Sequence, residues 1–146
     1  MKLFFGEDES LMIDFYFKTL TSRKQPYLSM DYQSFQEKAM KISPSIRYAT
    51  ITDSNGRVKS SGHRKGVKNL LTAKESLQSL KSSANIWKAR NQLSRKIGKG
   101  KYALAEYGKI KRIVIPLEKG HLLYLTTSAR ADHSTILRKA TRLKLK

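Results

Sequence analysis

Two short apolar segments near the C-terminal end of the chain constrain its fold more than any other feature. They are IVI at residues 113–115 and LLYL at residues 122–125. Each is apolar at consecutive positions, so a strand built from it must be covered on both faces. We therefore expect two central strands at residues 109–117 and 121–127, joined by a turn at 118–120, with other layers packed against both faces.

Further upstream, residues 47–62 predict a β-hairpin. The first half is rich in β-branched and aromatic residues, and Asn55-Gly56 favours a type I′ turn between the two strands. Val58 is the only apolar residue of the second half, at residues 57–61. Because so polar a strand cannot be buried on both faces, we expect it at an edge of the sheet.

Three helices are predicted around these strands. The first begins near Met30, where apolar residues recur at helical spacing. The second is long, at about residues 73–97, and begins with Thr72 and Glu75, which fit a capping box. The third begins at Asp132, a residue type that is favoured at the N-cap.

A third strand, at residues 102–107, lies between the long helix and the two central strands. The order of elements is therefore α-β-β-α-β-β-β-α, and we expect a fold of the α+β class. We assign one domain to residues 30–146. Residues 1–29 end in a polar, proline-containing stretch and are predicted to be an N-terminal extension or linker. They are either a docking extension or a segment that precedes a true start at Met30.

The long helix is predicted to carry two apolar faces that lie about 120° or more apart. The first face holds Leu77, Leu80, Ala84 and Trp87. The second face requires another partner, or it is wedged into a corner of the same fold. The strand at residues 102–107 leaves an apolar edge that a second copy of the chain can pair with. We therefore expect a homodimer, with an interface formed by Ile86, Leu93, Ile97, Tyr102 and Leu104.

The net charge of +19 indicates an affinity for polyanions. Four cations of the long helix recur every seven residues, so their row drifts by only about 20° per step and can follow a phosphate backbone. The alternative is a solvated face that serves solubility alone. Non-specific nucleic-acid binding is therefore a second candidate function, with contacts from Lys74, Lys81, Lys88, Arg95, Lys99, Lys101, Arg64, Lys65 and Lys68.

The sequence indicates no catalytic or metal site. His63, His121 and His133 are far apart and lack the spacing of metal ligands, and neither a P-loop nor a dinucleotide-binding fingerprint is present. The chain has no cysteine, which excludes disulfides. No segment is apolar over the roughly 20 residues that a membrane span needs. We expect a cytoplasmic, non-enzymatic protein without a cofactor.

The order and lengths of these elements resemble the Roadblock/LC7 family and, more broadly, profilin-like folds. The resemblance covers about residues 30–146. It is carried by the hairpin sequence IRYATITDSNGRVKSSG, the capped helix from Thr72, the meander at 102–127 and the closing helix from Asp132. The C-terminal part, RIVIPLEKGHLLYLTTSARADHSTILRKA, is also similar to small archaeal proteins of this layout. The dense positive charge and the N-terminal extension depart from the family pattern.

The resemblance implies a five-stranded antiparallel sheet with helices on both faces and the strand order 2-1-5-4-3. It also implies a dimer through the long helix and the strand after it, here residues 72–97 and 102–107. The family commonly regulates small GTPases or scaffolds larger assemblies, and it is not an enzyme family. The implied function is therefore a non-enzymatic regulatory or scaffold domain that acts through protein contacts, with a small GTPase or another signalling protein as its partner.

Overall fold

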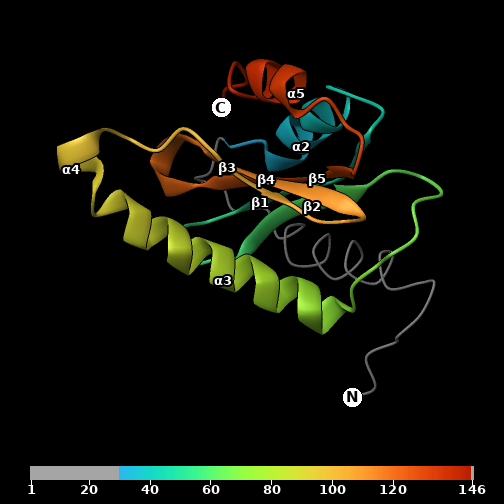
Figure 1. The fold of residues 1–146 in the computed structure, drawn as a ribbon, viewed down its shortest axis with the longest axis horizontal. Coiled ribbons are helices and arrows are strands. Elements are labelled where there is room, and N and C mark those ends of the chain that lie inside the picture. Colours follow the sequence, from blue (N-terminus) through green and yellow to red (C-terminus); the bar gives the residue numbers. More distant parts are fainter. Residues whose placement is uncertain (1–29, 146) are drawn as a thin grey trace.

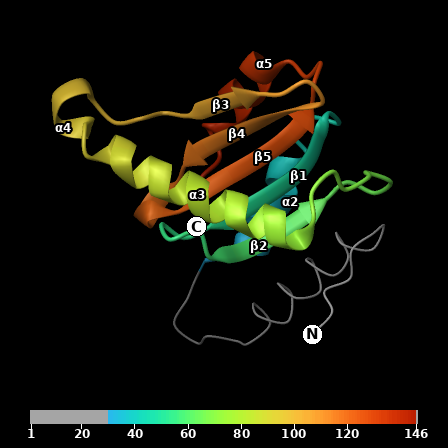
Figure 2. The same cartoon turned by 60° about the horizontal axis from the view of Figure 1, so that its bottom comes forward.

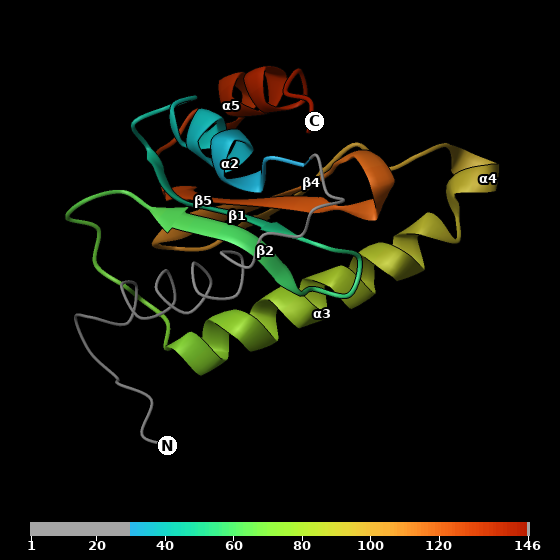
Figure 3. The ribbon, with the colours of Figure 1, turned by 180° about the vertical axis from the view of Figure 1, so that it is seen from behind.

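The computed structural model describes residues 30–145; residues 1–29, where the extension or linker is expected, and Lys146 lie outside the described part. The elements are α2 (Tyr32–Met40), β1 (Ile46–Thr52), β2 (Val58–His63), α3 (Ala73–Asn91), α4 (Ser94–Ile97), β3 (Ala103–Glu106), β4 (Ile110–Pro116), the 3₁₀ turn η1 (Glu118–Gly120), β5 (Leu122–Ser128) and α5 (His133–Ala140). All five strands form one antiparallel sheet in the order β2-β1-β5-β4-β3. Helices α2 and α5 cover one face and α3 lies on the other (Figures 1 and 3). The expected α+β class and strand order are confirmed.

The two strands with apolar segments lie inside the sheet, as predicted. Ile113 of β4 and both Leu123 and Leu125 of β5 have no exposed surface. The two strands pair from Ile110↔Ser128 to Pro116↔Leu122. Strands β2 and β3 are the two edges of the sheet, which agrees with the polar composition of β2.

Helices α2 and α5 seal one face of the sheet, which we call the closed face. Asp31 caps α2 and Asp132 caps α5, each by accepting a hydrogen bond from a backbone N–H of the first turn. Gly62 of β2 leaves room for the amide end of the Gln36 side chain of α2, because a Cβ there would lie 2.1 Å from it. The closed-face core consists of Phe35, Ala39, Ile46, Ala49, Ile51, Ile113, Ile115, Leu123, Leu125, Ala131, Ile136, Leu137, Ala140 and Leu145.

The turn between β1 and β2 is not the predicted type I′ turn. Gly56 has a φ of +82°, but Asn55 does not adopt a positive φ. The N–H of Gly56 donates to the carbonyl of Asp53 at 3.1 Å, so a type I turn is followed by a left-handed glycine. The physical reason is Asp53, whose carboxylate accepts hydrogen bonds from the N–H groups of Asn55 and Arg57. The turn rests against α3, since a Cβ at Gly56 would lie 2.9 Å from the Cα of Lys81.

Helix α3 begins with the predicted capping box between Thr72 and Glu75, but it is shorter than predicted. It ends at Asn91, and the next residues form the separate short helix α4. The row of cations on α3 therefore stops at Lys88. Three of the candidate site residues that were expected on the long helix lie beyond its end: Leu93, Arg95 and Ile97.

The break after α3 has a physical cause in the path of the chain. Beyond α4 the chain turns back toward β3 and crosses Trp87, where a Cβ at Gly100 would lie 3.2 Å from the indole ring. A continuous helix would carry the chain away from this contact. Asn91 and Ser94 favour helix ends over helix interiors, so the sequence permits the break.

Candidate functional site

Helix α3 covers only a strip of the second face of the sheet, which we call the open face (Figure 2). Three of its buried side chains, Leu80, Ala84 and Trp87, form a small core with two residues of β5. Leu77 was expected to share this buried face, but it is 39% exposed. Ile86 follows Leu77 by about two and a half helical turns, so these two residues lie on opposite flanks of α3.

The flank of α3 that faces β3, which we call the β3 flank, carries Ile86 of the predicted dimer interface, while Leu93, Ile97 and Tyr102 lie beyond the end of α3. Ile86, Leu93, Ile97 and Tyr102 are between 49% and 79% exposed. A hollow lined by Ile86 and Tyr107 lies between α3 and the strands β3 and β4. Strand β3 pairs with β4 alone, so its outer edge has no backbone partner within the described residues.

Strand β3 is shorter than the expected strand at residues 102–107. It begins at Ala103, so Tyr102 precedes it. Leu104 is paired with Ile113 and packs against the closed-face core. Because side chains alternate along a strand, Leu104 points away from the face on which Ile86 lies.

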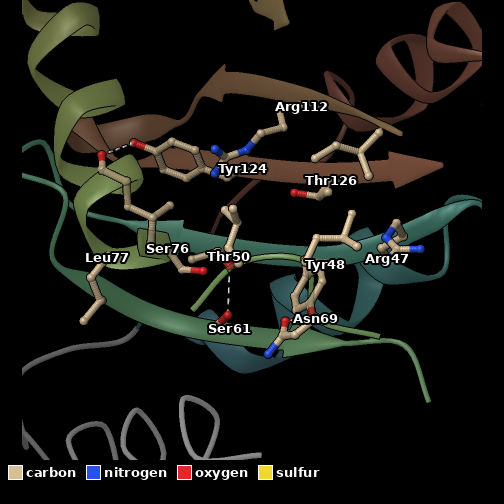
Figure 4. Close-up of a pocket in the computed structure, with 14 residues that line it drawn as sticks. Arg47, Tyr48, Thr50, Ser61, Asn69, Ser76, Leu77, Arg112, Tyr124 and Thr126 are labelled. Atoms are coloured by element: carbon tan, nitrogen blue, oxygen red, sulfur yellow. Dashed lines mark hydrogen bonds between the residues drawn. The ribbon is translucent and has the colours of Figure 1, made fainter. Parts of the chain in front are cut away.

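A cavity of about 90 Å³, which we call the α3 cavity, lies on the opposite flank, between the first turns of α3 and the sheet (Figure 4). Its floor is the open face of the sheet, where the Thr50 and Ser61 hydroxyl groups are 2.8 Å apart and hydrogen-bonded. The floor residues are polar: Tyr48, Thr50, Ser61 and Thr126. The wall residues are apolar: Leu70, Leu71, Leu77 and Leu80.

Two guanidinium groups and one amide also line the α3 cavity. Arg112 donates to the hydroxyl of Ser79, and Arg47 donates to a backbone carbonyl at 2.7 Å. The hydroxyl of Tyr48 donates to Oδ1 of Asn69, while the buried Nδ2 of Asn69 has no hydrogen-bond partner within residues 30–145. The cavity thus combines an apolar wall with donors and positive charge, a combination that suits an acidic and apolar occupant.

Tyr124 separates the α3 cavity from the hollow on the β3 flank and lines both. Its hydroxyl donates to the carbonyl of Leu80 at 3.4 Å. Burial raises the pKa of Tyr124 above the ordinary value of a tyrosine, because the ionised form loses hydration. The side chain therefore remains a neutral donor at physiological pH.

Sequence reasoning missed the α3 cavity, although the sequence contains two signals for it. In β1, the polar or amphipathic Tyr48 and Thr50 alternate with Ala49 and Ile51, which indicates a polar face opposite the closed-face core. In addition, the pair Leu70-Leu71 is an apolar interruption of a basic loop.

The expected phosphate-contacting residues are dispersed over the structure. Lys74 and Lys81 are exposed beside Leu77, whereas Lys88 donates to the side chain of Asn55 in the β1–β2 turn. Arg64 has a structural role, because its guanidinium donates to three backbone carbonyls between α2 and β1. The others are exposed, in the loop before α3 or beyond its end: Lys65, Lys68, Arg95, Lys99 and Lys101.

The three histidines lie in separate places. His121 forms a hydrogen bond of 3.0 Å with the hydroxyl of Tyr32, and Nδ1 of His133 is 2.9 Å from Nζ of Lys111, while His63 lies on β2. No group of three potential metal ligands occurs among residues 30–145. None of the helices described is both long and apolar enough to cross a membrane.

Comparison with known proteins identifies solved structures of similar fold. No family model and no curated protein sequence matches the chain. The gliding protein MglB from Thermus thermophilus superposes with a TM-score of 0.62 at 15% identity, over 75% of this chain and 82% of that chain. A structure described as MglB with a tetrameric arrangement gives the same values. A Roadblock/LC7 domain from Streptomyces avermitilis superposes with a TM-score of 0.60 at 13% identity, over 75% and 88% of the two chains. The chain therefore has the Roadblock/LC7 fold.

Proposed function

We propose that the chain is a non-enzymatic regulatory or scaffold domain that acts through protein contacts, as a homodimer formed through the β3 flank. The observation that supports this most directly is the exposed apolar surface of Ile86 on α3 and of Leu93 and Tyr102 in the connection from α3 to β3, together with an edge strand whose outer side is open within residues 30–145. An exposed apolar surface of this kind marks an interaction site. MglB, which has the same fold, has been described in a tetrameric arrangement.

A two-fold axis beside β3 explains how one surface can serve both partners. Strand β3 would pair with its copy across the axis, which satisfies the backbone groups of the open edge. The same axis would bring Ile86 of α3 toward its copy and remove apolar surface from water, at a gain of about 25 cal/mol per Å². Leu104 contributes to the fold of each protomer instead, since it packs on the closed-face core.

Charge substitutions on α3 test the homodimer. We expect Ile86→Asp and Leu93→Asp to give monomers, because each places a charge in the apolar interface while leaving the buried core of α3 intact. The matched control is Leu77→Asp, which makes the same change on the opposite flank and leaves the dimer in place. Light scattering gives the mass, and circular dichroism confirms that each variant is folded. A monomeric wild type, or dissociation by Leu77→Asp as well, would contradict the proposed interface.

The partner that the resemblance implies is a small GTPase or another signalling protein. Calorimetric titration of small GTPases from the same organism, loaded with GDP or with a non-hydrolysable GTP analogue, tests this. We expect binding that depends on the nucleotide and that weakens for the monomeric Ile86→Asp variant. Binding to none of the GTPases would exclude this partner class and leave the scaffold role with another protein.

A second candidate function is non-specific binding of nucleic acid. It is favoured by Lys74 and Lys81, which are exposed and form no ion pair with the described residues. Phosphate binding predicts that log K falls with log salt by about 0.9 per phosphate neutralised. Titrations of duplex DNA and RNA at several salt concentrations measure this slope. An absence of binding near physiological salt would remove the candidate.

A further inference from the structure

The entrance of the α3 cavity carries a strip of side chains that is both apolar and basic. We call it the Leu77 strip, and it consists of Leu70, Leu71, Lys74, Leu77 and Lys81. The three leucines are 36–49% exposed. Lys74 and Lys81 precede and follow Leu77 by three and four residues, so all three side chains share one face of α3.

Positive charge around this strip is not balanced within residues 30–145. Arg47 and Arg112 line the α3 cavity, and neither of them, nor Lys74 or Lys81, forms an ion pair with a described residue. The carboxylate of Glu75 is engaged in the helix cap, where it accepts a hydrogen bond from a backbone N–H at 2.9 Å. An occupant of this surface should therefore present carboxylates together with apolar side chains.

We propose that the occupant is residues 6–17 of the same chain, GEDESLMIDFYF, which dock over the α3 cavity and the Leu77 strip. This segment contains no Lys or Arg. Its acidic residues are Glu7, Asp8, Glu9 and Asp14, and its apolar residues are Leu11, Met12, Ile13, Phe15, Tyr16 and Phe17. Docking places carboxylates beside the two lysines, covers the leucines, and offers an acceptor to the unpartnered Nδ2 of Asn69.

The connecting chain is long enough for this placement. Residues 18–29 join the segment to Met30, and about twelve extended residues reach at most about 40 Å. The start of α2 lies on the closed face, so the connection passes one edge of the sheet, across about 20 Å of packed layers. Attachment to the same chain also gives the segment an effective concentration in the millimolar range. The β3 flank remains free, so docking and dimerisation do not compete.

Thiol cross-linking of the full-length chain tests the docking, because the chain has no cysteine of its own. One variant combines Ile13→Cys with Leu77→Cys, and its control combines Ile13→Cys with Ala89→Cys, an exposed position of α3 outside both the Leu77 strip and the proposed dimer interface. With a short bis-maleimide we expect the link to Leu77→Cys to form about tenfold faster, within one chain. Equal rates at the two positions, or no link to Leu77→Cys, would overturn the proposal. Links between two chains would overturn it too, and would assign the surface to the segment of a second copy.

Charge reversal of the strip tests the proposed complementarity. Lys74→Glu with Lys81→Glu should slow the cross-link several-fold, and Glu9→Lys with Asp14→Lys in the same chain should restore it. The control is Lys99→Glu with Lys101→Glu, which makes the same change in net charge beyond the end of α3 and should leave the rate unchanged. If both charge-reversal pairs slow the cross-link equally, or if Glu9→Lys with Asp14→Lys does not restore its rate, the proposed charge pairing between the segment and the Leu77 strip is wrong.

Discussion

The two faces of the sheet use the same five strands but are covered to very different extents. On the closed face, α2 and α5 bury a core that extends from Phe35 to Leu145. On the open face, the buried cluster is limited to three residues of α3 with Leu122 and Tyr124 of β5. The closed face therefore contributes most of the stability, whereas both flanks of α3 on the open face are left uncovered by the described residues.

Polar residues on the open face depart from the usual pattern, in which the face of a sheet that lies under a helix is apolar. Thr50, Ser61 and Thr126 lie beneath the start of α3, where aliphatic residues would bury more apolar area. Departures of this kind are expected where a surface serves binding. We therefore predict that matched substitutions on the two faces change the stability of the domain by different amounts.

The largest difference is expected for two neighbouring leucines of β5. Leu123 points to the closed face and Leu122 to the open face, and both are buried. Leu123→Ala should lower the free energy of unfolding by about 3–5 kcal/mol, because two helices pack on that face and hinder collapse of the cavity. Leu122→Ala should lower the free energy of unfolding by only about 2–3 kcal/mol, since a shift of α3 toward the sheet would partly fill the cavity. Urea unfolding of both variants measures the difference, and an equal or larger loss for Leu122→Ala would contradict the comparison.

A smaller difference is expected for two neighbouring cations of β4. Lys111 is buried on the closed face, where Nζ donates to the carbonyl of Ala131 at 2.9 Å and lies 3.4 Å from Glu106. Lys111→Met should lower the free energy of unfolding by about 1–3 kcal/mol, since the buried carbonyl of Ala131 loses its hydrogen-bond donor. Arg112→Met on the open face should cost less than about 1 kcal/mol, because Ser79 can hydrogen-bond to water instead. Thermal and urea unfolding measure both, and the reverse order would contradict the assignment of the two faces.

The closed face could be predicted from the sequence to a large extent, for identifiable reasons. Consecutive apolar residues such as those at 113–115 indicate a strand that is covered on both faces. Thr72 and Asp132 act through local hydrogen bonds that depend on neighbouring residues alone, so the starts of α3 and α5 were predicted correctly. The polar β2 was likewise predicted as an edge strand.

Features of the open face depend on contacts between distant residues and were harder to predict. The end of α3 accompanies the crossing of Gly100 over Trp87, a contact between distant residues, whereas Asn91 and Ser94 permit a break without fixing its position. The β1–β2 turn follows the carboxylate of Asp53 in place of the intrinsic preference of Asn55-Gly56. The α3 cavity combines residues of four strands, a loop and a helix, so only its polar strand face could be recognised in advance.

The smallest difference concerns the two carboxylates that cap a helix on each face. Hydrogen bonds from Thr72, first from its backbone and then from its side chain, lower the pKa of Glu75. Hydrogen bonds from the hydroxyl and N–H of Thr135 lower the pKa of Asp132. Because both folded-state pKa values are depressed, each group stabilises the fold above its ordinary pKa of about 4, and this contribution is lost as the pH falls through the folded value.

The isosteric variants Glu75→Gln and Asp132→Asn retain a capping side chain but remove its titration. The unfolding free energy of the wild type should decrease as the pH falls below about 4, and Asp132→Asn should make this decrease smaller. The reason is that α5 belongs to the closed face and unfolds with the whole domain. Glu75→Gln should instead act mainly on the amide hydrogen exchange of the first turn of α3, since that helix is held by a small core and opens locally. Urea unfolding and hydrogen exchange as functions of pH separate the two effects. The opposite result would contradict this expectation: Glu75→Gln would remove the acid dependence of the unfolding free energy, and Asp132→Asn would leave it unchanged. It would show that the unfolding of the domain is coupled to α3 rather than to α5.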